Sequence, residues 1–347
     1  RPDMSIKVER KLHDMRILGR IVRVRSTEQF VWHLLTPTLF YTFKEESTMI
    51  TWNNLDTLEA FKNLSKAERV NIAEAMSGEN GAERVKTYST PMAEGLAYNY
   101  AAKQVDDKVL EDLQKLADEA QLTEKFEALY NGEVINTGEK RMVLHHLTRG
   151  QLGEAVNADG TDKRAFYKEQ QQKIADFANK VHAGEITNAA GEKFTTVVQI
   201  GIGGSDLGPR AMYLALENWA KKNDTFKMEA KFISNVDPDD AAAVLYGIDV
   251  AHSIFILVSK SGTTLETLTN ESFVKDALKN AGLDASKHMI AVTSETSPLA
   301  KSDDYLAAFF MDDYIGGRYS STSAVGGAVL SLAFGPEVFE RFLNGAA

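Results

Sequence analysis

The sequence has no cysteine among its 347 residues. This absence excludes disulfides, thiolate zinc sites, iron–sulfur ligation and a cysteine nucleophile, and it is compatible with a reducing compartment. Because no run of about 18 or more apolar residues occurs, we expect no membrane-spanning helix and no membrane partner. Positive charge is also in deficit, with 39 Lys and Arg against 49 Asp and Glu, which disfavours a nucleic-acid partner and favours a small molecule.

Metal-binding patterns are missing as well. His145 and His146 are adjacent, so on a helix their side chains would point about 100° apart and could not hold one ion together. Neither an H-E-x-x-H motif nor a calcium loop occurs. We therefore expect no metal, and His145 is better explained as a hydrogen-bonded scaffold residue.

The length and the 44% apolar content predict a large core and more than one domain. Residues 1–48 differ from the rest, because they carry nine Lys and Arg against six Asp and Glu in an otherwise acidic chain that begins with Arg1. We expect them to be an atypical extension outside the fold, either native or left from upstream or expression sequence.

Helical patterns fill the stretch from about Leu55 to Gly150. Within it, apolar residues recur at helix spacing through 106–130, and Asn131-Gly132 supplies a stop signal. A second long helix is predicted over 166–181, where four of five positions on one face are apolar, and it should end before Gly184.

After Gly191 the pattern changes to alternating strands and helices. Four short apolar runs predict strands at 195–200, 229–234, 253–258 and 288–293, each followed by a helical stretch. This alternation predicts a parallel sheet covered on both faces, with ligands at the carboxyl ends of the strands. The loops after the strands are therefore the candidate sites.

The first such loop, Gly201–Gly208, has four glycines in eight positions and precedes a helix that we expect Pro209 to open. A dinucleotide fingerprint starting at Gly201 would require glycine where Asp206 stands, which disfavours a nicotinamide-dependent dehydrogenase. A tight turn needs fewer glycines, so we favour close approach of a ligand to the backbone, with Ser205 adding a hydroxyl.

The second loop, Ser259–Thr267, is more informative. Thr263 and Glu266 fit a capping box, which would explain part of the stretch without a ligand. Five hydroxyl residues nevertheless crowd around Gly262 at the start of a helix, a pattern suited to a phosphate monoester. The order of residues is not that of a nucleotide P-loop, and Lys260 fits a solvated charge, an ion-pair partner or a phosphate contact equally well.

The third loop, Gly316–Ser323, follows the acidic pair Asp312-Asp313. Two glycines before Arg318 would allow its guanidinium to approach a ligand and stabilise an oxyanion. An ion pair between Arg318 and either aspartate fits the spacing equally well.

Together these three loops resemble the signature segments of the glucose-6-phosphate isomerases, in order and at plausible separations. Two further segments, Asn136–Arg149 and Phe232–Asp237, are also similar to that family. The resemblance covers Met49–Ala347 and implies an α/β fold: a three-layer, flavodoxin-like parallel-sheet sugar isomerase domain preceded by a helical region. We accordingly expect a helical region at 49–184, the α/β domain at 185–331, and the start of a further part at 332–347.

The resemblance also implies an activity, the aldose–ketose isomerisation of glucose 6-phosphate and fructose 6-phosphate through an enediolate in glycolysis and gluconeogenesis. It implies no metal or organic cofactor, a cytoplasmic location, and a homodimer when full length. The matching positions assign the substrate phosphate to Ser259, Ser261, Thr264 and Thr267, the sugar site to Gly204 and Ser205, and the enediolate charge to Arg318, with Lys260 a further substrate-binding candidate.

The family's catalytic glutamate, ring-opening histidine and late lysine have no match in this chain, which stops in what reads as mid-helix. We therefore expect an amino-terminal portion of such an isomerase that is inactive alone. The alternative is a standalone regulatory module that binds a sugar phosphate without catalysis.

Overall fold

The computed structural model describes residues 49–150 and 162–347. The predicted extension over residues 1–48 lies outside the described residues. The part of the chain before Gly150 is built from short elements. Its helices are α2 (Glu59–Leu64), α3 (Ile72–Ala75), α4 (Gly78–Thr87), α5 (Asp107–Glu119), α6 (Leu122–Tyr130) and α7 (His145–Thr148).

Two features of this part differ from the sequence-based expectation. The helix expected over 106–130 is divided into α5 and α6, because Gln121 adopts a left-handed conformation (φ 52°) that a continuous helix cannot contain. The stretch expected to be helical also contains a β-hairpin, in which β1 (Ser89–Pro91) pairs antiparallel with β2 (Ala97–Asn99).

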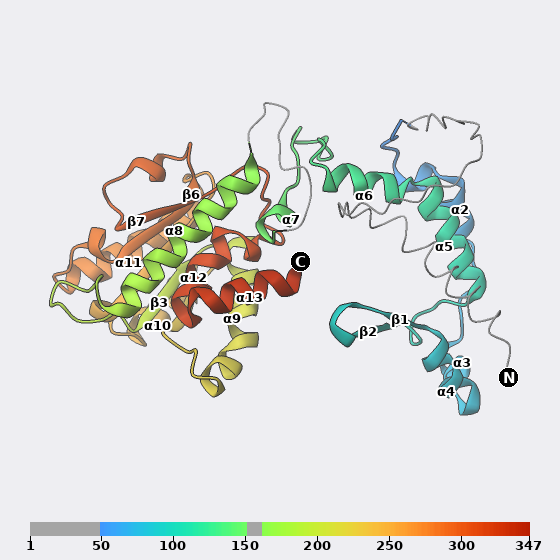
Figure 1. The fold of residues 1–347 in the computed structure, drawn as a ribbon, viewed down its shortest axis with the longest axis horizontal. Coiled ribbons are helices and arrows are strands. Elements are labelled where there is room, and N and C mark those ends of the chain that lie inside the picture. Colours follow the sequence, from blue (N-terminus) through green and yellow to red (C-terminus); the bar gives the residue numbers. More distant parts are fainter. Residues whose placement is uncertain (1–48, 151–161) are drawn as a thin grey trace, which may run out of the picture. The chain divides into compact units, whose positions relative to one another are not determined.

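The remainder is an α/β sandwich around a five-stranded parallel sheet with strand order β4-β3-β5-β6-β7 (Figure 1). Its strands are β3 (Thr196–Ile200), β4 (Glu229–Ile233), β5 (Ser253–Val258), β6 (Met289–Ser294) and β7 (Ala307–Met311). The four predicted strands are confirmed to within one residue at each end, whereas β7 is a fifth strand that was not expected. The order is the flavodoxin-like one, which confirms the predicted fold class.

Helices cover both faces of the sheet because successive strand residues point to opposite sides. In β5, Ile254, Ile256 and Val258 join an apolar layer with one set of helices, while Phe255 and Leu257 join the other. The first set is α8 (Lys163–Ala183), α9 (Gly204–Lys222), α12 (Ala324–Phe334) and α13 (Pro336–Ala346), and the second is α10 (Pro238–Tyr246) and α11 (Leu265–Asn280).

Helix α12 lies at the centre of the first layer, where every one of its residues is buried. Helix α8 packs on the same layer through Ile174, Phe177 and Val181, and it ends at Ala183, before Gly184 as predicted. The domain boundaries at 184 and 331 stay a prediction.

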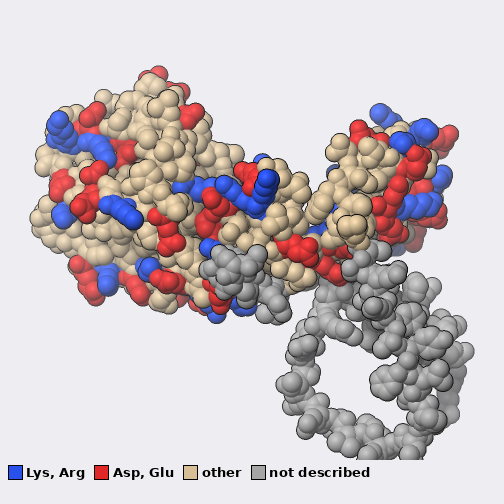
Figure 2. Space-filling model, turned by 90° about the horizontal axis from the view of Figure 1, so that it is seen from above, with Lys and Arg blue, Asp and Glu red and all other residues tan. Residues whose placement is uncertain are grey.

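Figure 2 shows acidic and basic side chains intermixed over the visible face of the sandwich. Among the described residues no helix is long and apolar enough to cross a membrane.

Candidate functional site

A cavity of about 260 Å³ opens at the carboxyl ends of the central strands. It lies at the switch point of the sheet, because the chain leaves β3 for β4 on one side and returns to β5 on the other. Its polar lining comes from three loops: Ser205 after β3, the residues Ser259, Lys260, Ser261, Thr264 and Thr267 after β5, and Gly317 and Ser320 after β7. We call this space the hydroxyl cavity.

The second loop is folded tightly around Gly262. Gly262 has φ +69°, and a Cβ there would overlap the Ser297 hydroxyl, so only glycine fits. The Gly262 N–H donates to Ser259 Oγ at 3.1 Å, and Ser259 Oγ donates to Thr264 Oγ1 at 3.3 Å. These bonds hold the loop so that Ser259 and Thr267, both almost fully buried, line the cavity.

The capping box expected from Thr263 and Glu266 does not form. Thr264 is the N-cap residue of α11, and its side chain makes no capping hydrogen bond. Thr263 Oγ1 instead donates to Ser261 Oγ at 3.0 Å. The start of α11 therefore retains uncapped N–H groups, beside a cluster of hydroxyls, where a helix dipole favours an anion.

Lys260 extends from this loop to the loop after β7. Its ammonium nitrogen lies 3.9 Å from Asp313 Oδ1, and both side chains are partly exposed. The ion-pair interpretation of Lys260 therefore has a partner, although a pair this long and this exposed stabilises little. Lys260 remains a lining residue of the hydroxyl cavity, so the contact with a ligand stays a prediction.

The glycines of the first loop are used mainly for close packing. A Cβ on Gly204 would overlap the Gly317 carbonyl, and one on Gly208 would overlap the Ser321 hydroxyl. The start of α9 therefore packs directly against the loop after β7. Protein packing alone explains why these two positions are glycine, while Ser205 lines the cavity and the contact of Gly204 with a ligand stays a prediction.

Helix α9 begins at Gly204, not at Pro209 as expected. A proline in a helix leaves the carbonyl four residues earlier without its N–H partner. Here that carbonyl belongs to Ser205, and the side-chain amide of Gln199 donates to it at 2.7 Å. The buried Gln199 thus allows the helix to continue through Pro209.

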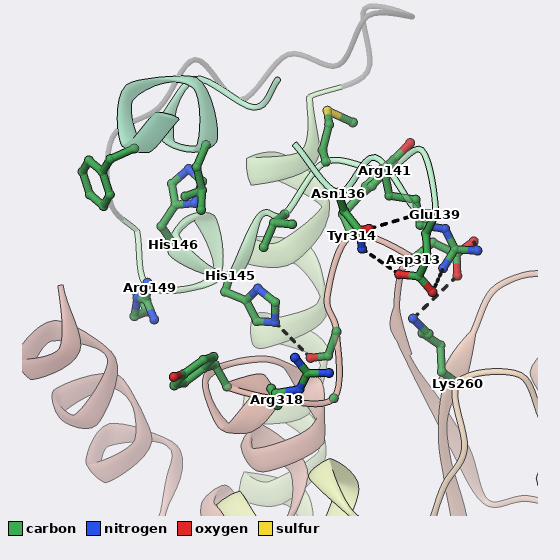
Figure 3. A pocket seen from close by; sticks show the side chains of 17 residues that line it. Asn136, Glu139, Arg141, His145, His146, Arg149, Lys260, Asp313, Tyr314 and Arg318 are labelled. Atoms are coloured by element: carbon green, nitrogen blue, oxygen red, sulfur yellow. Dashed lines mark hydrogen bonds and ion pairs between the residues drawn. The ribbon is translucent and has the colours of Figure 1, made fainter. Parts of the chain in front are cut away.

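Arg318 lies at the edge of a larger cavity of about 560 Å³ that shares Lys260 and Gly317 with the hydroxyl cavity (Figure 3). Within the described residues the exposed Arg318 side chain makes no hydrogen bond or ion pair, so the alternative of pairing with Asp312 or Asp313 is wrong. Asp312 accepts from the Tyr167 hydroxyl and pairs with Lys163, and Asp313 pairs with Arg141 at 3.4 Å. The guanidinium is left available to a ligand.

His145 faces the same loop. Its Nε2 lies 2.9 Å from the Gly316 carbonyl oxygen, which agrees with a hydrogen-bonded scaffold role. Burial is the main cause that lowers the pKa of His145, with hydrogen bonds to the backbone acting in the opposite direction.

The structure thus brings together seven of the eight sequence-predicted site residues: six line the hydroxyl cavity, and Gly204 packs against Gly317 in its wall. Arg318 adjoins them in the larger cavity. Ser320 was not among the predicted site residues, and its buried hydroxyl donates to the Gly204 carbonyl at 3.2 Å. Ser320 lies two residues after Arg318 in a serine-rich run, and this position could have indicated that it belongs to the site. Among the described residues there is no cluster of three or more His, Cys, Asp or Glu that could hold a metal.

The fold and the position of the cavity define a three-layer α/β protein with its candidate site at the switch point of the sheet. Residues 99–347 match the family model for phosphoglucose isomerase, and the chain belongs to that family. The family consists of aldose–ketose isomerases.

Curated relatives and a solved structure agree. The chain is 59% identical over 301 residues to the glucose-6-phosphate isomerase of Treponema denticola, covering 85% of this chain and 57% of that protein. It is 44% identical over 302 residues to that of Borreliella afzelii, covering 86% and 56%. A crystal structure of a glucose-6-phosphate isomerase from Chlamydia trachomatis matches with a TM-score of 0.71 and 37% identity, covering 85% of this chain and 56% of that one. The chain therefore spans a little over half the length of these relatives.

Proposed function

We propose that this chain supplies the phosphate-binding and charge-stabilising part of a glucose-6-phosphate isomerase. The observation that carries the proposal is the convergence of hydroxyl groups from three separate loops on one cavity beside the uncapped start of α11. Hydroxyls and free N–H groups at a helix start are suited to the oxygens of a phosphate monoester.

In this proposal Ser259, Ser261, Thr264 and Thr267 hold the phosphate, and Lys260 adds a positive charge at the rim. Ser205 and Gly204 border the sugar. The two cavities share Lys260 and Gly317, so a sugar phosphate bound in the first can extend toward Arg318 in the second.

Isomerisation of the aldose moves a proton from C2, the carbon beside the carbonyl, to C1, the carbonyl carbon itself. A base removes the proton on C2 of the open-chain aldose, the electrons form an enediolate, and a proton is then returned to C1 while the hydroxyl proton passes from O2 to O1. A fixed cation beside the developing oxyanion lowers the barrier of this step. We propose Arg318 for this role, because its guanidinium carries no other ion pair among the described residues.

The base is not assigned to a residue of this chain. No Asp or Glu of the described residues lines the hydroxyl cavity, and Glu139 and Asp313 in the larger cavity are engaged by Arg141. We propose that the chain alone binds glucose 6-phosphate without turning it over. The proposal includes action in the cytoplasm without a metal or organic cofactor, and a homodimer for the full-length protein.

Calorimetric titration of the chain with glucose 6-phosphate tests the phosphate site. Ser261→Ala combined with Thr264→Ala should weaken binding by about tenfold to a hundredfold, because each hydrogen bond to a charged group contributes roughly 1.5–3 kcal/mol and the two losses are not fully additive. Thr269→Ala is the matched control, since its hydroxyl donates to the Leu265 carbonyl of its own helix.

Equal affinity for the double variant and the control would contradict the phosphate site. Binding without turnover in every longer form of the protein would instead favour the sugar-phosphate-binding module.

A further inference from the structure

The segment 141–148 follows the loop after β7 closely, although the two lie about half the chain apart. Four contacts join them in order: Arg141 with Asp313 at 3.4 Å, the Leu144 N–H with the Tyr314 carbonyl at 3.1 Å, His145 Nε2 with the Gly316 carbonyl at 2.9 Å, and the Thr148 and Thr322 hydroxyls at 2.8 Å. The segment is therefore bonded to both sides of the glycine pair that precedes Arg318.

His145 is the contact nearest to that pair. Within the described part of the chain, Gly316 makes no backbone–backbone hydrogen bond, so the His145 ring supplies its hydrogen-bonded restraint. Gly316 and Gly317 have no Cβ and can adopt many conformations, which makes the backbone before Arg318 intrinsically pliant. Figure 3 shows the His145 ring close to the Arg318 side chain, with a dashed line for the ring's hydrogen bond.

The chemistry of the contact fixes which ring nitrogen carries the proton. A carbonyl oxygen only accepts, so Nε2 must carry the hydrogen that lies toward Gly316. The ring also meets the Tyr319 ring edge to face, with centroids 6.5 Å apart. One imidazole thus contacts the residues on either side of Gly317-Arg318.

We propose that His145 is a positioning residue, which holds the Gly316–Tyr319 backbone so that Arg318 reaches the C1 end of a sugar phosphate, where the oxyanion develops. The inference rests on the proposed function, since it takes the hydroxyl cavity as the phosphate site. It assigns His145 no contact with the substrate and no proton transfer.

The experiment compares two ligands on the full chain by calorimetry. 6-Phosphogluconate carries a carboxylate at C1, whereas glucitol 6-phosphate carries a neutral hydroxyl there, so the ratio of their affinities reports the effect of Arg318 separately from phosphate binding. We expect the wild type to prefer 6-phosphogluconate and Arg318→Ala to lose that preference. His145→Ala should reduce the preference by about fivefold or more, and His145→Gln, whose amide can still donate, should restore part of it. Affinity for glucitol 6-phosphate should stay within about twofold of the wild type.

His146→Ala is the matched control. His146 is also an imidazole bonded to a backbone carbonyl, but it is buried, where His145 is half-buried, and its partner is Tyr130 at 3.0 Å, in α6. It should lower the melting temperature as His145→Ala does and leave the ligand preference unchanged.

Several results would overturn the inference. The first is an unchanged ligand preference in His145→Ala. The second is an equal loss of affinity for both ligands in that variant, and the third is the same loss of preference in His146→Ala. A wild type that binds both ligands equally overturns the role of Arg318 and this inference while leaving the phosphate site in place. A wild type that binds neither ligand overturns the proposed function and the inference with it.

Discussion

Replacing Gly204 by alanine adds one methyl group where α9 meets the loop after β7. The new Cβ would overlap the carbonyl group of Gly317 and lie 2.7 Å from its Cα. All three atoms belong to the backbone, so no flexible side chain can move aside. The start of α9 and the Gly317-Arg318 backbone must therefore separate by about an ångström to restore ordinary contact distances of about 3.5 Å or more.

Two opposing terms set the size of the effect. Inserting a methyl group into packed structure costs about 1–3 kcal/mol. Alanine in a helix is favoured over glycine by about 1 kcal/mol, which offsets part of that cost. Because the clash is with backbone, we expect the steric term to lie at its upper end, leaving a net loss of about 1–2 kcal/mol and a melting temperature lower by about 2–8 °C.

Thermal unfolding and calorimetry together test this expectation. Gly204→Ala should melt lower and bind 6-phosphogluconate more weakly, because the displaced backbone carries Arg318. Gly345→Ala is the control, since nothing lies within 4 Å of a Cβ at that position of α13, and it should melt at the same temperature or slightly higher. If Gly204→Ala melted like the control and kept its affinity for 6-phosphogluconate, the close packing of α9 on the loop after β7 would contribute nothing to stability or to the position of Arg318.

Two further predictions concern Gln199 and His252. Gln199→Leu should lower the free energy of unfolding by about 1–3 kcal/mol, because it leaves the Ser205 carbonyl unpaired. In a Pro209→Ala background this loss of stability should be smaller, because the restored N–H of residue 209 can reach the same carbonyl. Equal losses in both backgrounds, measured by urea denaturation, would contradict this prediction. The pKa of His252 is raised, mainly by its hydrogen bond to Asp249 and also by one to Glu192. A folded-state pKa above the unfolded value of about 6.5 means that the stabilisation is complete below that pH and is lost as the pH rises through the folded pKa. The difference in stability between wild type and His252→Gln should therefore be largest just below about pH 6.5 and fade as the pH rises through the folded-state pKa of His252. A difference that grew with pH over this range would refute the ion pair.

A strand could be predicted from the sequence where it contains a run of β-branched residues. The strands β3, β5 and β6 fit this pattern, because they are buried on both faces, whereas β4 is an edge strand with an exposed Glu229. Strand β7 has the sequence Ala-Ala-Phe-Phe-Met, without a β-branched residue, and its pairing with β6 makes it a strand. The break between α5 and α6 was equally hidden, because the left-handed residue there is Gln121 rather than glycine or asparagine.

The residues predicted for the site lie together in the structure, and their role as a substrate site stays a prediction. The hydroxyl residues after β5 do meet Ser205 and Ser320 from the loops after β3 and β7, because parallel strands end at one edge of the sheet. The capping box does not form because Thr264 is the N-cap of α11 and Thr263 bonds to Ser261 instead. The start of α9 was misread because the local pattern ignores distant partners. Gln199 permits a helix to begin ahead of Pro209, and the loop after β7 requires glycine at 204.

A crystal structure of the chain with bound 6-phosphogluconate tests the central claim most directly. We expect the phosphate within hydrogen-bond distance of Ser261, Thr264 and the first N–H groups of α11, and the carboxylate directed toward Arg318. A phosphate bound elsewhere, such as between Arg141 and Arg149, with the hydroxyl cavity left to water, would contradict it.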